Sequence, residues 1–143
     1  MKTRAYSVSV VVVVVILVLV GMVFAGTGDL QLKVKDKVGN YLADGSGMTL
    51  YYFKNNAKDK NACAGPCLEK WPVFYSEKVK SPAGSDAKDF GEFTRADGKK
   101  QTTFKGWPLY YFAGDKAAGD TNGQAVKDIW FTVNPVVMEN CMK

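Results

Sequence analysis

The pair of cysteines in the segment CAGPC is the first feature of the sequence that could carry out chemistry. Cys63 and Cys67 are separated by three residues, and Cys141 is the third cysteine of the chain. Thioredoxin-like redox motifs and haem-attachment motifs both begin Cys-x2-Cys, so this spacing fits neither. In an oxidising compartment the simplest expectation is a structural disulfide between Cys63 and Cys67. Cys141 is then a free thiol or a link to another chain.

A glycine-rich loop at residues 113–124, AGDKAAGDTNGQ, carries a dense group of side-chain oxygens. Its alternating polar part resembles a fraction of a calcium-binding loop, but the Glu that completes an EF-hand is missing. The alternative, which we favour, is that these side chains accept hydrogen bonds from the backbone of their own loop. The weak calcium candidates are Asp115, Asp120, Asn122 and Gln124.

Several catalytic mechanisms are excluded by the composition. The chain has no histidine, so Ser–His and Cys–His nucleophiles and a histidine-dependent zinc–water site are ruled out. The carboxylates of Asp115 and Asp120 are close in sequence, but nothing nearby is expected to raise the pKa of either one. Met138, Cys141 and Met142 are soft donors that suit Cu(I), although such residues at a chain end are usually only a tail. We expect no enzyme and no cofactor.

The N-terminal segment directs the chain out of the cytoplasm. Two basic residues precede an apolar stretch at residues 8–24, which is the order found in a secretion signal. Small residues near the end of this stretch allow cleavage between residues 25 and 26. Cleavage there would remove residues 1–25 and release a domain of residues 26–143. The alternative is a retained anchor, because about 17 apolar residues is the lower limit for a membrane-spanning helix. Either way, the domain is expected in the periplasm, at the cell surface or outside the cell.

The charge of the chain gives no reason to expect a nucleic-acid partner. The formal net charge is +5, and the exported part carries about +3 (5 − 2) once the two leading basic residues are set aside. Its lysines are scattered among acidic residues, as on a solvated surface. We expect an envelope or extracellular partner, and contact with a membrane only through the N-terminal segment.

A duplicated unit of about 45 residues organises the exported part. The segments GMTLYYF at 47–53 and GWPLYYF at 106–112 are nearly the same, and an ungapped shift of 59 positions aligns them. Similarity at a fixed spacing of this kind is the sequence signature of a repeated structural unit. The identities in this register are Gly39 with Gly98, Gly47 with Gly106, Leu50 with Leu109, Tyr51 with Tyr110, Tyr52 with Tyr111, Phe53 with Phe112 and Trp71 with Trp130.

Each copy has the pattern of short strands joined by glycine-containing turns. The second copy predicts strands at 90–95, 101–104 and 108–112, with Asp97-Gly98 as a favoured hairpin turn. A further short strand is expected at each closing Trp, at 71–74 and 130–133. The predicted fold is all-β: two duplicated three- to four-stranded meander repeats, at about 30–75 and 89–135, sharing one core and preceded by an N-terminal apolar helix.

The repeated aromatic segment is best explained as framework. Successive residues of a strand point to opposite faces, and the run TLYYF is apolar on both faces. Such a strand belongs in the middle of a small sandwich or barrel. The Trp that follows each Phe by 18 positions can close the same core, since Tyr and Trp combine a large buried area with a polar group.

These residues resemble the secreted bacterial lipoprotein repeat family whose signature is Tyr-x-(Phe/Trp/Tyr)-x-x-Asp. The resemblance covers about residues 45–135 and implies an exported two-copy protein, but it carries no established activity. The second copy matches with Tyr110, Phe112, Asp115, Gly119-Asp120, Gly123-Gln124 and Trp130. The first copy matches with Tyr51, Phe53, Cys63, Cys67 and Trp71-Pro72, but Asn56 stands where Asp is expected.

Two departures from that family limit what the resemblance implies. No cysteine lies near the end of the apolar segment, so the lipid-attachment site is absent. Many relatives place a His after the last Trp, whereas this chain has Phe131, which gives no support to a metal or haem role there. We expect a non-catalytic exported envelope protein that binds or scaffolds an unidentified partner. The alternative is a redox or metal-handling accessory protein that uses Cys63 and Cys67 or Cys141.

Overall fold

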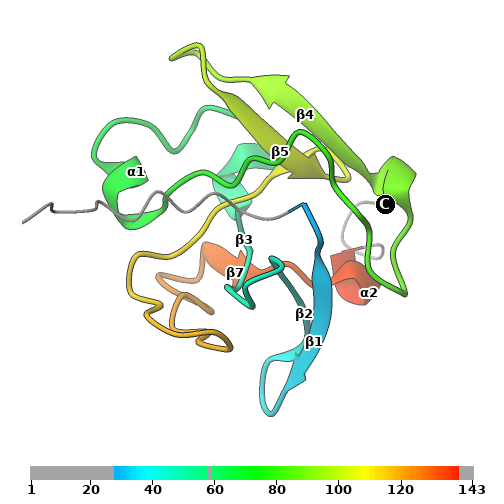
Figure 1. Cartoon of the computed structure of the whole chain (residues 1–143). Helices are drawn as coiled ribbons and strands as arrows, with labels where there is room; N and C mark the ends of the chain where they lie inside the picture. Colours follow the sequence, from blue (N-terminus) through cyan, green and yellow to red (C-terminus); the bar gives the residue numbers. More distant parts are fainter. Residues whose placement is uncertain (1–27, 58, 139–143) are drawn as a thin grey trace, which may run out of the picture.

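The protein is described here by a computed structural model covering residues 28–57 and 59–138. Within these ranges the fold is mostly β, with small sheets joined by long irregular segments (Figure 1). The predicted N-terminal helix and Cys141 lie outside the described residues.

The strands are β1 Gln31–Lys35, β2 Gly39–Ala43, β3 Tyr51–Phe53, β4 Phe90–Thr94, β5 Lys100–Phe104, β6 Trp107–Pro108 and β7 Trp130–Thr132; the helices are α1 Cys67–Lys70 and α2 Pro135–Met138, with 3-10 turns η1 Lys54–Ala57 and η2 Ala87–Asp89.

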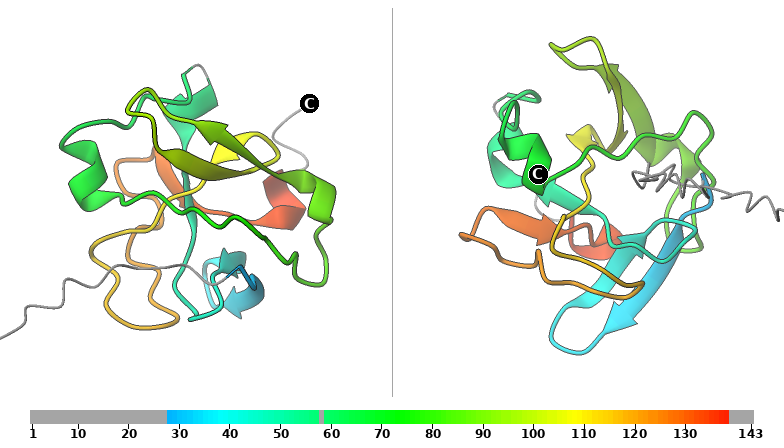
Figure 2. Two further views of the ribbon diagram at one scale, coloured as in Figure 1. Left: turned by 45° about the horizontal axis from the view of Figure 1, so that its top comes forward. Right: turned by 60° about the vertical axis from the view of Figure 1, so that its left-hand side comes forward.

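Both copies form the predicted hairpin, and the segment that follows each hairpin turns back onto its second strand. β1 pairs antiparallel with β2, and an isolated bridge between Ala43 and Thr49 joins the next segment to β2. In the second copy β4, β5 and β6 form an antiparallel meander. The first copy then continues into β3, which pairs with β7 from the other copy and lies beside it in Figures 1 and 2. The two copies are therefore interlocked. No helix in the described ranges is both long and apolar enough to cross a membrane.

The turns that follow the first two strands of each copy explain why glycine recurs in the repeat. Gly39 and Gly98 have φ angles of +80° and +82°, and the next pair, Gly47 and Gly106, have +86° and +84°. This left-handed region is easily reached only by glycine. Glycine therefore takes the same left-handed conformation at both equivalent positions of the two copies.

A local two-fold relation links the copies at their motif strands. The Tyr51 amide donates to the Tyr110 carbonyl oxygen at 2.8 Å, and the Tyr110 amide donates back to the Tyr51 carbonyl oxygen at 2.9 Å. Equivalent residues thus meet face to face between the copies. Two further matched sets are Lys54 N to Ile129 O (2.8 Å) with Ala113 N to Lys70 O (2.8 Å), and Val133 N to Leu50 O (3.0 Å) with Phe74 N to Leu109 O (2.9 Å).

A proline accounts for the difference between the closing segments of the two copies. The second copy forms β7, in which Phe131 is the partner of Tyr52. The equivalent position in the first copy is Pro72, which has no backbone N–H and cannot complete a ladder. Its carbonyl still accepts from the Tyr111 amide at 2.7 Å, and of the strand predicted at 71–74 the structure retains a single bridge between Val73 and Tyr110.

The core consists of two hydrophobic clusters, and each contains residues from both copies. One lies among the hairpins, and the other is built around the motif aromatics. The first cluster contains Leu30, Leu42, Leu50, Phe74, Phe104, Leu109, Tyr111, Val133 and Met138. The second contains Tyr51, Phe53, Cys63, Trp71, Tyr110 and Trp130.

Candidate functional site

Four aromatic rings from the two copies form one continuous stack. The Trp71 and Trp130 ring centroids are 3.8 Å apart, and their planes differ by 3°. Phe53 stacks on the outer face of this pair at 4.3 Å from Trp130, and Phe112 lies 4.5 Å from Trp71. Each Phe therefore contacts the Trp of the other copy, so neither copy can build this core alone.

The motif tyrosines pack edge-on against the same stack. Tyr51 lies 5.5 Å from Trp71 at an interplanar angle of 75°, and Tyr110 lies 5.2 Å from Trp130 at 89°. Edge-to-face contacts of this kind are favoured by the charge distribution of aromatic rings. The two tyrosines and the two tryptophans are all buried, so the repeated aromatic residues serve chiefly as framework.

The last residue of the signature, Asp or Asn, forms a hydrogen bond to the other copy. The Tyr51 hydroxyl donates to Asp115 Oδ2 at 2.7 Å, and the Tyr110 hydroxyl donates to Asn56 Oδ1 at 3.1 Å. The Tyr of each copy is thus bound by the Asp or Asn of the other copy. Burial, together with the Asp115 carboxylate, raises the pKa of Tyr51 far above its ordinary value of 10.0.

Asp115 and Asn56 use their remaining side-chain atoms differently. Asp115 Oδ1 accepts from the Asn122 amide at 2.9 Å, which fixes its own loop as predicted. Asn56 instead donates from Nδ2 to the Asp59 carbonyl oxygen at 2.7 Å. An amide suits a site with one donor and one acceptor, whereas a carboxylate suits a site with two donors.

Replacing Asp115 with Asn should therefore lower the free energy of unfolding by about 2 kcal/mol, because an amide can accept from only one of the two donors, the buried Tyr51 hydroxyl and the partly buried Asn122 amide. Urea denaturation measures the change. The control is Asp36→Asn on the exposed β1–β2 turn, which should stay within about 0.5 kcal/mol of the wild type. Equal stability of Asp115→Asn and wild type would contradict the assigned hydrogen bonds.

Two other calcium candidates also accept hydrogen bonds from the backbone. Asp120 Oδ2 accepts from the backbone amides of Lys116 and Ala117 at 2.8 and 2.9 Å, and these bonds lower the pKa of Asp120. Gln124 Oε1 accepts from the Thr132 amide at 2.8 Å. Among the described residues no group of three or more His, Cys, Asp or Glu side chains is placed to hold a metal ion. Met138, a copper candidate, is buried in the first core cluster.

The predicted disulfide is confirmed. Cys63 and Cys67 are joined by a bond of 2.04 Å, and this short closed loop stabilises the fold by about 2 kcal/mol on the chain-entropy model. The Trp71 amide donates to the Cys67 carbonyl oxygen at 2.9 Å, and the Trp130 amide donates to Val126 O at 3.2 Å. The stapled loop of the first copy thus occupies the position of the hydrogen-bonded loop of the second.

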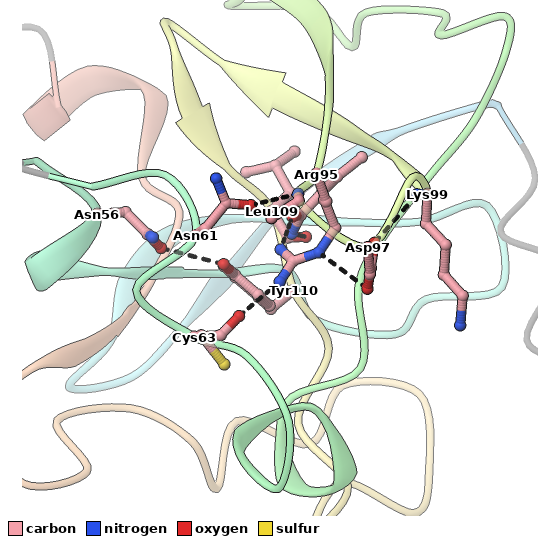
Figure 3. Close-up of polar contacts among 10 residues, drawn as sticks. Asn56, Asn61, Cys63, Arg95, Asp97, Lys99, Leu109 and Tyr110 are labelled. Carbon is pink, nitrogen blue, oxygen red and sulfur yellow. Dashed lines mark hydrogen bonds and ion pairs between the residues drawn. The ribbon is translucent and has the colours of Figure 1, made fainter.

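A buried arginine, which the sequence did not single out, ties the disulfide loop to the β4–β5 hairpin (Figure 3). The Arg95 side chain donates from one terminal nitrogen to the carbonyl oxygen of Cys63 at 2.5 Å and from the other to Gln101 Oε1. Its Nε lies 3.8 Å from an Asp97 carboxylate oxygen. The residue stands in the turn sequence RADGKK, where a basic residue normally faces solvent, so no local pattern marks it as buried.

A groove lies over one end of the aromatic stack and has a volume of about 750 Å³. The four stacked rings contribute to its lining, and α1 supplies Cys67 and Lys70. The segment 126–130 supplies Val126, Lys127 and Ile129. This size and apolar character are typical of sites for small ligands.

The groove lies where the local two-fold relation breaks down. In the first copy the wall is the short helix α1 next to the disulfide. In the second copy Ala125, Lys127 and Asp128 all have positive φ angles, of 60°, 52° and 57°. Backbone of this kind is strained for residues other than glycine and clusters at functional sites.

Comparison with known protein families also finds two copies of a repeat in the chain. A family described as a secreted repeat of unknown function matches the chain twice, at residues 33–75 and 91–134. These two matches include the motif residues of both copies and cover more than half of the chain, so the chain belongs to this family of secreted repeats. No curated protein and no solved structure matches the chain.

Proposed function

We propose that the protein is a non-catalytic module of the cell envelope that binds a partner molecule in the groove over the aromatic stack. The observation that carries this proposal is the groove itself, because residues of both copies form one apolar site. An interlocked frame holds that site, and Val126 and Lys127 of the strained segment 125–128 lie in one of its walls. Pre-formed concave sites of this kind are the usual places for ligand binding.

A role without catalysis agrees with the state of the polar groups nearest the stack. Asp115 is buried, and its two oxygens accept from Tyr51 and from the Asn122 amide. A carboxylate used in this way is poorly placed to act as a general base. The pKa of Tyr51 is raised by burial, so its hydroxyl is an even weaker acid than that of an ordinary tyrosine.

The cellular setting of this proposal is outside the cytoplasm. The family is one of secreted repeats, and the N-terminal apolar stretch at residues 8–24 supplies an export signal or an anchor. A partner in the periplasm, at the cell surface or in the surroundings is consistent with both.

The redox alternative has less support. Cys63 is fully buried, and Cys67 is partly covered in the groove wall. Redox-active cysteines are usually exposed and reactive, whereas the Cys63 carbonyl is also bound by the buried Arg95. A structural staple accounts for all of these contacts.

The test is an NMR titration of the ¹⁵N-labelled protein, expressed with its own N-terminal segment, using 2-naphthoate and the neutral 2-naphthamide as probes. We expect saturable shifts of the amide signals of Ala113, Gly114, Val126 and Ile129 with at least one probe. Ala113 is exposed at the groove, so Ala113→Trp should fill the site and abolish these shifts. Ala83→Trp, on an exposed turn away from the groove, is the matched control and should leave them intact. Absence of groove shifts with both probes would overturn the proposal.

A further inference from the structure

The charged groups around the groove have one sign. Of the residues that line it, the charged ones are Lys70 and Lys127. Lys70 ends α1 and Lys127 lies in the strained segment of the other copy, so the two cations come from different copies. Both residues are exposed. Glu69 and Asp128 are their neighbours in sequence, but neither lines the groove.

These two lysines differ from the surface lysines that are held by a carboxylate. Lys80, Lys88 and Lys100 each form an ion pair with a carboxylate 2.8 to 3.0 Å away. Within residues 28–57 and 59–138, neither Lys70 nor Lys127 takes part in an ion pair. Their ammonium groups therefore remain available to a bound anion at the groove.

We infer that the ligand of the groove is a small amphiphilic acid: an apolar body lies over the aromatic floor, and its anionic group lies near Lys70 and Lys127. This inference rests on the proposed function and adds the chemical class of the ligand. The apolar body supplies most of the affinity, since burial of apolar surface is the main favourable contribution in such sites. The lysines select the acid over its neutral and cationic analogues.

The selectivity expected from two exposed cations is moderate. An exposed ion pair changes affinity by about two- to five-fold, and salt weakens it. The acid should therefore bind about five- to twenty-fold more tightly than its neutral isostere at low salt, and the ratio should fall as salt is added. An aromatic acid and a fatty acid share this chemistry.

The experiment compares dissociation constants for three probes with the same ring body: 2-naphthoate, 2-naphthamide and 2-naphthylmethylammonium. We expect the order acid, amide, ammonium from tightest to weakest. Decanoate is measured in parallel, and tighter binding of decanoate than of naphthoate would identify a fatty acid as the source. Lys70→Gln and Lys127→Gln should each reduce the preference for acid over amide by about two- to five-fold, without changing the affinity for the amide.

Lys78→Gln is the control, because this exposed lysine lies outside the groove and its loss should leave the preference unchanged. Equal affinities for naphthoate and naphthamide would overturn the inference while the proposed function stands. A preference that survives in the Lys70→Gln/Lys127→Gln double variant would also overturn it. Absence of binding by every probe would overturn both proposals.

Discussion

Replacing either Trp71 or Trp130 with alanine is expected to lower the free energy of unfolding by about 3–5 kcal/mol. Both side chains are buried with 4% exposure, and truncating a buried tryptophan costs this much through lost burial and the cavity left behind. Natural domains are stable by only about 5–15 kcal/mol, so each variant should lose a large share of its stability. Urea denaturation at 25 °C measures the change for each single variant and for the double variant.

The double variant shows whether the two tryptophans stabilise the fold together or independently of each other. Because the two rings are in direct contact at 3.8 Å, removal of one already costs the other its partner. The cost of the double variant should fall short of the sum of the single costs by about 1 kcal/mol or more. Val34→Ala is the control, because Val34 is 76% exposed, and its effect should stay within about 0.5 kcal/mol. Strictly additive costs would show that the stack is not an energetic unit.

The sequence was informative about which residues are equivalent. The register of 59 positions aligned Tyr51 with Tyr110 and Trp71 with Trp130, and the structure places these pairs in matching contacts on either side of a local two-fold axis. Glycine, tyrosine and tryptophan carried that alignment because each fills a site that few other residues can fill. The hairpins followed from their turn residues for the same reason.

The pairing between the copies could not be predicted in the same way. An apolar run such as that of β3 indicates a buried strand, but it does not specify which strand will lie beside it. The segment before Tyr51–Phe53 pairs with β2 through the bridge between Ala43 and Thr49, yet β3 itself pairs with β7 from the other copy. This pairing places Phe53 opposite Trp130, where the two rings stack.

Residues whose role comes from distant partners were also missed. Arg95 contacts Cys63 and Gln101, and Asp44 accepts the Tyr111 hydroxyl at 2.8 Å. In the sequence both stand at turns, where charged residues are expected in solvent. The groove was missed because its walls, α1 and the segment 125–128, are where the two copies differ.

At alkaline pH, the protein is expected to lose about 3 kcal/mol of stability between pH 9 and pH 11. Burial and the neighbouring carboxylates of Asp115 and Asp44 raise the pKa values of Tyr51 and Tyr111 far above the ordinary value of 10.0. Above pH 10 the unfolded chain releases these protons while the folded chain retains them, so the unfolded state is increasingly favoured. Each such tyrosine contributes about 1.4 kcal/mol at pH 11, and this contribution is fully present as stability below pH 9.

Denaturation in urea across this pH range, with Tyr51→Phe as the test variant, separates the tyrosine effect from general alkaline damage. At neutral pH the variant should be less stable than wild type, because Asp115 and the Gly123 amide lose the hydroxyl that they share. Between pH 9 and pH 11 it should nevertheless lose less stability than wild type, since one of the strongly shifted protons is gone. Tyr111→Phe should behave in the same way, through the loss of its bond to Asp44.

If wild type and both variants lost stability in parallel, the alkaline transition would not arise from these buried hydroxyls. A reduced loss in both variants would show that the hydroxyls of Tyr51 and Tyr111 keep their protons in the folded protein over this pH range.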